Sequence, residues 1–506
     1  MRSISSRQRS RILELEEAAR PLDPGAGERD RLMALVHAYA QRFLTGLPER
    51  PAYEYDKSAV AEIRELGVGT DTRPIERLID RIDESVVGAG LVPSHGGHLG
   101  YIPGGGIYAS SLADYLAAVT NEYAGVRFTG PGAVEMENVV LGWMARLAGY
   151  PATCAGNLAS GGSIASLIAV VTAREAAGLR ARDYERAVVY SSSHLHHCLH
   201  KALRMAGVGE AVRRDVPLDG DYRMRADALA EFVEEDRARG LRPWLVFASA
   251  GTVDIGAIDP LAEIADVAER EDLWFHVDGA YGGFFAMLEE IRPALAGLER
   301  SDSLVLDPHK GMFLPYGTGA VLVRDGKALA DAHESGASYL QDTVEAERWG
   351  PSPAAVSPEL TKHFRGLRVW LPLLLHGEAP FEACLREKLE LARYFHGEIE
   401  ALGFEVGPEP ELSVVTYRWV PESGDANAFN RALVDETHRD GRVFLSSTTI
   451  DGTVWLRMAA LAFRTHLDTI DLALEVLRES VGRLEARPER WRAASTAGAL
   501  AGRGSG

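Results

Sequence analysis

Two ionisable residues that follow apolar runs have the clearest chemical potential in this sequence. Asp278 ends a run that starts at Leu273, and Lys310 closes the tetrapeptide DPHK (307–310) after a second run. A lysine between two buried strands is costly unless its charge is used or removed, and a Schiff base to an aldehyde would use it. Taken alone, Lys310 is more often a surface side chain and Asp278 a turn or helix-cap acid. The pair together is much more specific.

The two residues are the protein groups that pyridoxal 5'-phosphate needs. A lysine bonds to the cofactor aldehyde, and a carboxylate keeps the ring nitrogen protonated so that the ring can accept electrons. Asp278 lies at the end of a predicted parallel strand, where α/β sheets bind their ligands. The sequence therefore indicates a pyridoxal phosphate site built on Asp278 and Lys310.

With these residues the sequence resembles the pyridoxal-phosphate-dependent group II amino-acid decarboxylases, which include aromatic-amino-acid, glutamate, histidine and diaminobutyrate decarboxylases. The segments HVDGAYGG (276–283) and DPHK (307–310) carry the resemblance, which extends from about residue 28 to about residue 481. It implies an α/β protein of fold-type I, in which helices flank a mostly parallel sheet. It also implies an N-terminal helical segment, a small C-terminal α+β domain and a homodimer with shared active sites.

The resemblance assigns further residues to the cofactor. Lys310 would form the Schiff base, Asp278 would pair with the ring nitrogen, and His196 would stack on the ring. The turn Gly161-Gly162-Ser163 precedes a predicted helix, and free amides at a helix N-terminus suit a phosphate. His309 would assist proton transfer or position the phosphate. The remaining cofactor contacts are expected from Thr252, Ala280, Asp307 and His309.

The histidine-rich segment around His196 allows a second interpretation. His196 and His200 are spaced i, i+4 with Cys198 between them, a pattern that could bind a metal. The distance of His196 from Lys201-Ala202 matches the stacking histidine of the family. We favour that interpretation and expect no metal.

The substrate side of the site is predicted on two loops. Tyr339 opens a segment with little periodicity, and in the family a mobile loop starting at this tyrosine closes over the site and protonates the substrate Cα. Tyr101, Ile102 and Gly104 match residues of the substrate pocket. Ile102 and Gly104 stand where aromatic-amino-acid decarboxylases tend to have Phe and Thr, which argues against a catechol-type substrate. Aromatic L-amino acids rank first, ahead of acidic and basic ones.

The implied reaction is decarboxylation of an L-amino acid to the amine and CO₂ through a quinonoid intermediate. The substrate amine displaces Lys310, CO₂ leaves, and Tyr339 returns a proton to Cα. One alternative is oxidative deamination to an aldehyde, typical of relatives that lack the loop tyrosine. Others are an aminotransferase of the same fold, or a non-catalytic metal- or partner-binding protein.

Elements that position these residues can be read from periodicity. Strands and helices alternate from 150 to 323, which predicts a mostly parallel sheet covered on both faces. Asp259 and Pro260 are expected to start a helix as its N-cap and first residue. The expected strands are 187–190, one that opens the segment 243–269, 273–277, 304–306, 320–323, 412–419, 443–447 and 453–461, and the expected helices are 29–44, 110–120, 133–148, 367–381, 428–437 and one from 468.

Four parts are predicted along the chain. They are an N-terminal helical segment with the pocket loop at 1–105, a cofactor-binding domain at 106–375, a small domain at 376–485 and a disordered tail at 486–506. Residues before 28 are polar and expected to fray. The boundaries imply one large and one small folded domain after the N-terminal segment.

Composition excludes several classes of protein. The net charge of −19 argues against binding to nucleic acid, which needs a basic surface. No apolar run approaches the length of a membrane span, and no signal peptide is visible. The 3 cysteines are scattered and suit a reducing cytoplasm. The predicted partner is a small-molecule amino acid, with no nucleic acid and no membrane.

Overall fold

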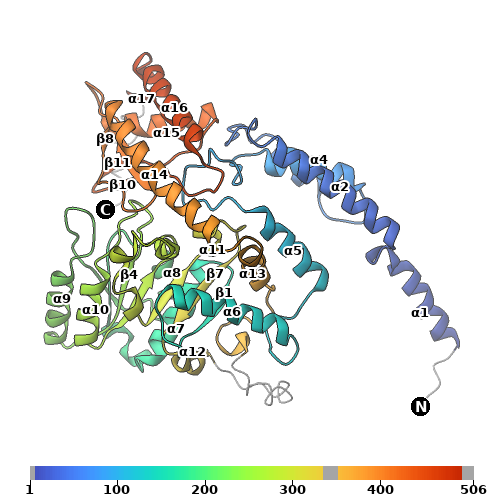
Figure 1. The fold of residues 1–506 in the computed structure, drawn as a ribbon, viewed down its shortest axis with the longest axis horizontal. Coiled ribbons are helices and arrows are strands. Elements are labelled where there is room, and N and C mark those ends of the chain that lie inside the picture. The colour runs from blue at the N-terminus through green and yellow to red at the C-terminus, as the bar shows by residue number, and fades with distance from the viewer. Residues whose placement is uncertain (1–5, 334–351, 493–506) are drawn as a thin grey trace. The chain divides into compact units, whose positions relative to one another are not determined.

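A computed structural model of the protein describes residues 6–333 and 352–492 (Figure 1). The chain forms two compact units, one up to Val92 and one from Pro93 onward. The loop 93–105, predicted with the N-terminal segment, belongs to the second unit. Its Leu99 N donates to Phe444 O at 2.9 Å, and Ala459 N donates to Leu99 O at 2.8 Å. These bonds tie the loop to the C-terminal sheet.

The first unit is helical. Helix α2 confirms the predicted helix 29–44, and α1 begins at Ser6 in the stretch expected to fray. Asp83 accepts from Tyr39 Oη at 3.0 Å and from Arg50 Nη2 at 2.7 Å, which holds α2 against η2. The elements of this unit are α1 (Ser6–Ala19), η1 (Arg20–Leu22), α2 (Ala26–Thr45), α3 (Val60–Leu66), α4 (Ile75–Ile82) and η2 (Asp83–Val87).

A seven-stranded sheet in the order β1-β7-β6-β5-β4-β2-β3 forms the centre of the second unit. Its neighbours pair in parallel from β6 through β5, β4 and β2 to β3, whereas β7 is antiparallel to both β6 and β1. The mostly parallel α/β fold is therefore confirmed. The strands are β1 (Ala155–Ala159), β2 (Ala187–Ser191), β3 (Val212–Asp215), β4 (Arg242–Ser249), β5 (Trp274–Asp278), β6 (Ser303–Leu306) and β7 (Gly319–Val323).

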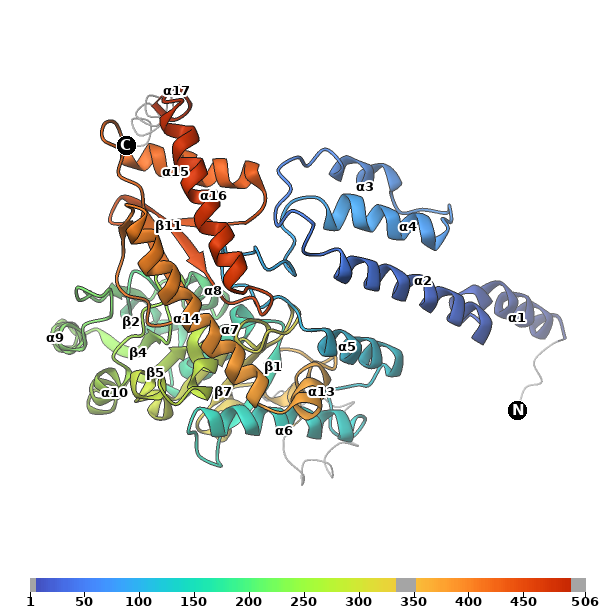
Figure 2. The same cartoon turned by 45° about the horizontal axis from the view of Figure 1, so that its top comes forward.

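Helices cover both faces of this sheet (Figure 2). Leu245 and Phe247 pack toward α8, whereas Val246 and Ala248 pack toward α9 and α10, as the alternation of a strand requires. The helices of this region are α5 (Tyr108–Thr120), α6 (Pro131–Leu147), α7 (Gly162–Ala176), η3 (Ala181–Arg186), α8 (Cys198–Met205), α9 (Ala226–Ala238), α10 (Leu261–Arg270), η4 (Gly282–Met287), η5 (Arg292–Leu295), η6 (Leu298–Arg300), α11 (Pro308–Gly311), α12 (Gly326–His333) and η9 (Pro353–Ala355).

This region contains a missed strand and a wrong local prediction. Strand β1 was not predicted, because the sequence AGNLA has no β-branched or aromatic residue and the strand forms only by pairing with β7. Asp259 is not a helix cap, since α10 begins at Leu261. The buried Asp259 carboxylate instead accepts from Met224 N at 2.7 Å and Ser249 N at 2.8 Å.

The C-terminal part contains a four-stranded antiparallel sheet in the order β10-β11-β9-β8. The predicted helix 367–381 is interrupted at Gly377, whose φ of 72° ends α13 before α14 begins. Within the predicted tail, α17 is helical. The elements are α13 (Gly366–His376), α14 (Ala379–Ala401), β8 (Glu405–Val406), β9 (Val414–Arg418), α15 (Ala426–Asp440), β10 (Ser446–Ile450), β11 (Thr453–Ala459), α16 (Leu467–Glu485) and α17 (Glu489–Arg492).

Within the described part of the chain, no helix combines the length and the apolar character that crossing a membrane requires.

Candidate active site

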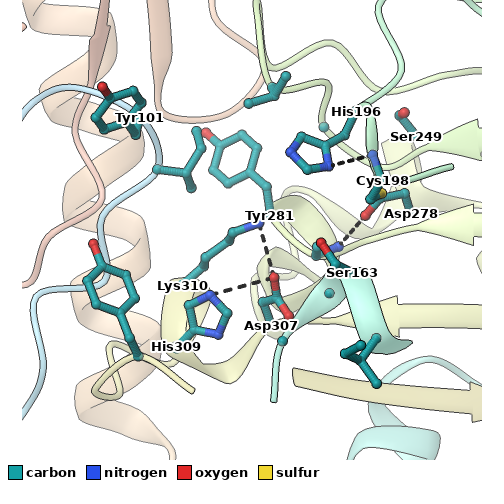
Figure 3. Close-up of a pocket in the computed structure, with 18 of the residues that line it drawn as sticks. Tyr101, Ser163, His196, Cys198, Ser249, Asp278, Tyr281, Asp307, His309 and Lys310 are labelled. Carbon is teal, nitrogen blue, oxygen red and sulfur yellow. Dashed lines mark hydrogen bonds and ion pairs between the residues drawn. The ribbon is translucent and has the colours of Figure 1, made fainter. Parts of the chain in front are cut away.

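A cavity of about 610 Å³ lies at the carboxyl ends of the parallel strands (Figure 3). Ser249 ends β4, Asp278 ends β5, and Asp307 follows β6, so three neighbouring strands deliver polar side chains to one place. This is the edge at which open α/β sheets bind their ligands. The cavity therefore lies where the sequence predicts the site.

Asp278 is buried and fixed at the base of the cavity. One carboxylate oxygen accepts from Ala280 N at 3.0 Å, and the other lies 3.8 Å from Cys198 Sγ, which donates to it. The side chain is 9% exposed. A carboxylate held in this way can pair with a cation or with a protonated ring nitrogen in the cavity.

Lys310 reaches the same cavity from the short helix α11. Its Nζ lies 3.1 Å from Asp307 Oδ2. Burial opposes the charged form, but the carboxylates of Asp307 and Asp278 outweigh it and raise the pKa of Lys310. The amine is therefore held as an ammonium beside two acids, and it must lose a proton before it can bond to an aldehyde.

Two predicted histidines line the cavity (Figure 3). His309 Nδ1 lies 2.6 Å from Thr318 O, and its Nε2 lies 3.7 Å from Asp307 Oδ2. His196 Nδ1 accepts from Cys198 N at 3.3 Å. Burial lowers the pKa of His196, against the opposing charge of Asp278. The His196 ring is thus favoured in its neutral form at the edge of the cavity.

The turn Gly161-Gly162-Ser163 leads into the 15-residue helix α7 and lines the cavity. A Cβ on Gly162 would lie 2.9 Å from Asp307 Oδ2, so only glycine allows this approach. The amides of a first helical turn have no partner within the helix and can bind an anion. The turn therefore offers the cavity a helix N-terminus that could hold an anionic group.

The residues fit pyridoxal phosphate on chemical grounds. One cavity combines a lysine amine, a buried carboxylate, an aromatic histidine and the N-terminus of a long helix. These groups correspond to the aldehyde, the ring nitrogen, the ring face and the phosphate of the cofactor.

Comparison with known proteins agrees with this geometry. Residues 70–420 match the family model of the pyridoxal-dependent decarboxylase conserved domain. The chain belongs to this family.

Relatives extend over most of the chain. The aromatic-L-amino-acid decarboxylase of Bacillus atrophaeus is 32% identical over 395 residues, which cover 76% of this chain and 82% of that protein. The phenylacetaldehyde synthase of Arabidopsis thaliana is 29% identical over 398 residues, 76% of this chain and 81% of the relative. The crystal structure of Oryza sativa TDC with PLP and tryptamine superposes with a TM-score of 0.86 at 24% identity, covering 91% of this chain and 99% of that one. The protein is a pyridoxal-phosphate-dependent amino-acid decarboxylase.

Four of the other predicted site residues line the cavity, and one lies outside the described part of the chain. Tyr101, Ile102, Thr252 and Ala280 line the cavity, and Thr252 Oγ1 also accepts from Ala257 N at 3.2 Å. Tyr339 lies outside the described residues.

Gly104, predicted as a substrate-pocket residue, does not line the cavity. A Cβ at this position would lie 2.1 Å from His309 O, so the glycine allows the loop to pack against the backbone beside Lys310. Backbone packing therefore requires glycine at this position.

Several lining residues were missed by sequence reasoning. Ser249, Cys198, Tyr281 and Tyr316 all border the cavity. Tyr281 lies within the HVDGAYGG segment, and its Oη accepts from Ser413 N at 2.7 Å. Tyr316 follows Lys310 closely, and its ring centroid lies 5.8 Å from that of His309. Proximity to the two motifs was the available signal for Tyr281 and Tyr316.

Arg457 connects two walls of the cavity. Its guanidinium donates to Asp254 O at 2.9 Å and to Val253 O on the loop that carries Thr252. It also donates to Ser446 Oγ at 3.0 Å, and that hydroxyl accepts from Tyr101 N at 3.4 Å. Arg457 therefore pairs mainly with backbone carbonyls, which positions both loops.

Proposed function

We propose that this decarboxylase converts an aromatic L-amino acid to the corresponding amine and CO₂. The observation that carries the proposal is the outer part of the cavity, which is lined by Tyr101, Ile102 and Tyr316. The Tyr101 ring packs 5.6 Å from that of Phe444, which extends the aromatic surface behind it. A planar aromatic side chain would find apolar contact there.

Charge supports the same substrate class. Among the described residues of the cavity lining, the acids are Asp278 and Asp307, and Lys310 is the only Lys or Arg. All three lie at the inner end, where the cofactor would engage them. An acidic or basic substrate side chain would have no counter-charge on the described outer wall, and an unpaired charge is costly to desolvate. The Bacillus relative named as an aromatic-L-amino-acid decarboxylase agrees.

We assign the inner residues to the cofactor. Lys310 would hold the aldehyde covalently, Asp278 would hold the proton on the ring nitrogen, and His196 would stack on the ring. The turn Gly161–Ser163 would bind the phosphate, and Thr252 and Ala280 would contact the cofactor from the other wall. Bound pyridoxal phosphate supplies the sink for the electron pair that remains on Cα when CO₂ leaves.

Proton transfer would involve Asp307, His309 and Tyr339. Asp307 Oδ2 is close enough to accept the proton that the Lys310 ammonium must lose. His309 Nε2 lies 3.7 Å from the same oxygen, beyond hydrogen-bond distance but close enough to place its ring beside the Lys310–Asp307 pair. Tyr339 would then protonate Cα, consistent with the amine rather than the aldehyde as the product.

Assembly and location are part of the proposal. Apolar side chains such as Ile12, Leu15, Val36 and Ile82 are exposed on the helices of the first unit, which fits a homodimer in which a second chain covers them. Cys154, Cys198 and Cys384 are all free thiols, which fits the cytoplasm.

Product analysis tests the proposal. The enzyme would be loaded with pyridoxal phosphate and supplied with aromatic, acidic and basic L-amino acids, while CO₂, amine, aldehyde and peroxide are measured. We expect equal amounts of amine and CO₂ from an aromatic substrate. Turnover confined to acidic or basic substrates would contradict the substrate class.

The same assay separates the amine from the aldehyde. A relative named phenylacetaldehyde synthase makes aldehyde formation the alternative. Aldehyde with peroxide from the wild type would show that Tyr339 does not protonate Cα. A Tyr339→Phe variant should shift the products toward aldehyde if it does.

A further inference from the structure

Three potential metal ligands converge at the inner end of the cavity. His196, Cys198 and Asp278 each offer one ligand atom, and these atoms lie within 4.8 Å of one another. Cys198 Sγ is 3.8 Å from Asp278 Oδ2, and both residues are buried. Figure 3 shows the three side chains together on one side of the cavity. They come from the start of α8, the segment before it and the end of β5.

The set differs from the one that the histidine spacing suggested. His200 is exposed, and its Nδ1 lies 2.7 Å from Arg213 Nη1, so it is engaged away from Cys198. Asp278, distant in sequence, takes its place. Imidazole, thiolate and carboxylate are the usual protein ligands of Zn²⁺, and three of them beside an open cavity leave a fourth position for water.

We propose that the cofactor-free enzyme binds a thiophilic divalent cation such as Zn²⁺ at His196, Cys198 and Asp278, and that this cation and pyridoxal phosphate exclude one another. The metal site rests on the geometry of the three side chains. The exclusion rests on the proposed function, in which Asp278 and His196 contact the cofactor ring.

Metal binding requires Cys198 to lose its thiol proton. This proton is released to solvent as the Zn–S bond forms, so about one proton leaves Cys198 for each metal bound.

Zn²⁺ and pyridoxal phosphate would compete while the enzyme takes up its cofactor. A metal ion bound to Asp278 removes the carboxylate that the ring nitrogen needs, and its coordinated water occupies space beside His196. Cofactor already bound would in turn remove two of the three metal ligands. The expected effect is slower uptake of pyridoxal phosphate in the presence of Zn²⁺ and protection of loaded enzyme from Zn²⁺.

Co²⁺ is the probe for the test, because a Co²⁺–thiolate bond gives an ultraviolet charge-transfer band. The full chain would be stripped of cofactor, checked by circular dichroism and titrated with Co²⁺. The variants are Cys198→Ser and, as a matched control, Cys384→Ser, whose thiol lies in α14 beside a different cavity. His196→Gln provides a second variant should Cys198→Ser fail to fold.

We expect one Co²⁺ per chain with a thiolate band in the wild type and in Cys384→Ser. The band should be lost in Cys198→Ser, weakened in His196→Gln and displaced by Zn²⁺. Absence of the band in the wild type, or its equal loss in Cys384→Ser, would overturn the metal site.

A second measurement separates this proposal from the proposed function. Uptake of pyridoxal phosphate is followed by its visible absorption with and without Zn²⁺. Slower uptake in the wild type but not in Cys198→Ser supports exclusion. A full thiolate band in the loaded enzyme would overturn exclusion whatever the substrate class, whereas failure of aromatic amino acids as substrates would leave metal binding unaffected.

Discussion

The inner and outer parts of the cavity differ in burial and in the elements that carry them. Asp307 and Thr252 of the inner part are each 2% exposed. Asp307 directly follows β6, and Thr252 lies on the loop just after β4, so both are placed by the seven-stranded sheet. Tyr101 and Tyr316 of the outer part are 60% and 56% exposed and lie on loops. The inner part is fixed by the sheet and suits the cofactor, whereas the outer part can vary with the substrate.

The outer part depends on contacts from elsewhere. Tyr101 has a φ of 57°, a conformation that side chains other than glycine rarely adopt. Its amide bonds to Ser446 Oγ, which also accepts from Arg457, so the small sheet maintains this backbone. Changes in the inner part should therefore affect chemistry and cofactor binding, and changes in the outer part should affect substrate choice.

The largest expected effect is at Lys310. Replacing Lys310 by Ala removes the amine that we propose bonds to the aldehyde, and we expect kcat to fall on the order of 10⁴-fold. Steady-state CO₂ release measures this. Lys362→Ala is an unsuitable control because Lys362 forms a buried ion pair with Glu137 at 2.7 Å, so the exposed Lys327→Ala is used. Activity of Lys310→Ala within tenfold of the wild type would contradict the role of the inner part.

Asp278→Asn should have the next largest effect. The amide keeps the shape of the carboxylate but cannot stabilise a protonated ring nitrogen. We expect kcat to fall by roughly 10²–10³-fold, as for loss of one preorganised electrostatic contact. The absorption spectrum of bound cofactor should shift as well. An unchanged spectrum with unchanged kcat would show that Asp278 does not face the ring nitrogen.

Stability of the inner part should depend on pH through His276. This residue lies two positions before Asp278 on β5, is fully buried, and burial lowers its pKa to about 4. Between pH 6.5 and 4 the unfolded state binds the extra proton, so the stability contributed by neutral His276 is lost as pH falls. The stability advantage of wild type over His276→Asn should shrink by roughly 3 kcal/mol across this range.

Denaturant unfolding at pH 7 and pH 4 measures this difference. Asp259 is buried and Asp302 is half-buried, and desolvation raises the pKa of each to about 6, so they titrate in the same range with the opposite sign. Their contribution cancels when the two proteins are compared. Phe247→Leu is the control, because the Phe247 ring packs 4.2 Å from His276 and carries no ionisable group. An equal difference in unfolding free energy between wild type and His276→Asn at both pH values would refute the lowered pKa of His276.

The smallest effect is expected at Ile102. Replacing Ile102 by Ala removes a few methylene-sized groups from the outer wall and enlarges the pocket. We expect the ratio of kcat/KM between two aromatic substrates to change by about tenfold. The spectrum of bound cofactor should not change. Competition assays with tryptophan and phenylalanine measure the ratio. A large loss of kcat for every substrate would show that the two parts are not separable.

Sequence reasoning identified the inner part because its residues lie in short motifs. The apolar runs before Asp278 and Lys310 are the strands β5 and β6, and both runs are continuous because helices cover the two faces of the sheet. Local composition was enough to place these two residues at one edge. The α/β class followed from the same alternation.

The errors arose where distant contacts decide the structure. Gly104 is fixed by the carbonyl of His309, and β1 exists because β7 pairs with it. Asp259 bonds to amides of other segments instead of capping its own helix. None of these contacts leaves a local pattern in the sequence. The metal-ligand group containing Asp278 was missed for the same reason, since only His196 and Cys198 are neighbours along the chain.

Identification of the residue that carries the cofactor tests the central claim most directly. The loaded enzyme would be reduced with borohydride, digested and mapped by mass spectrometry. We predict a single pyridoxyl group on the peptide that contains Lys310, and none when Asp278 and Lys310 are both replaced. Modification of a different lysine would contradict the assignment of this cavity as the active site.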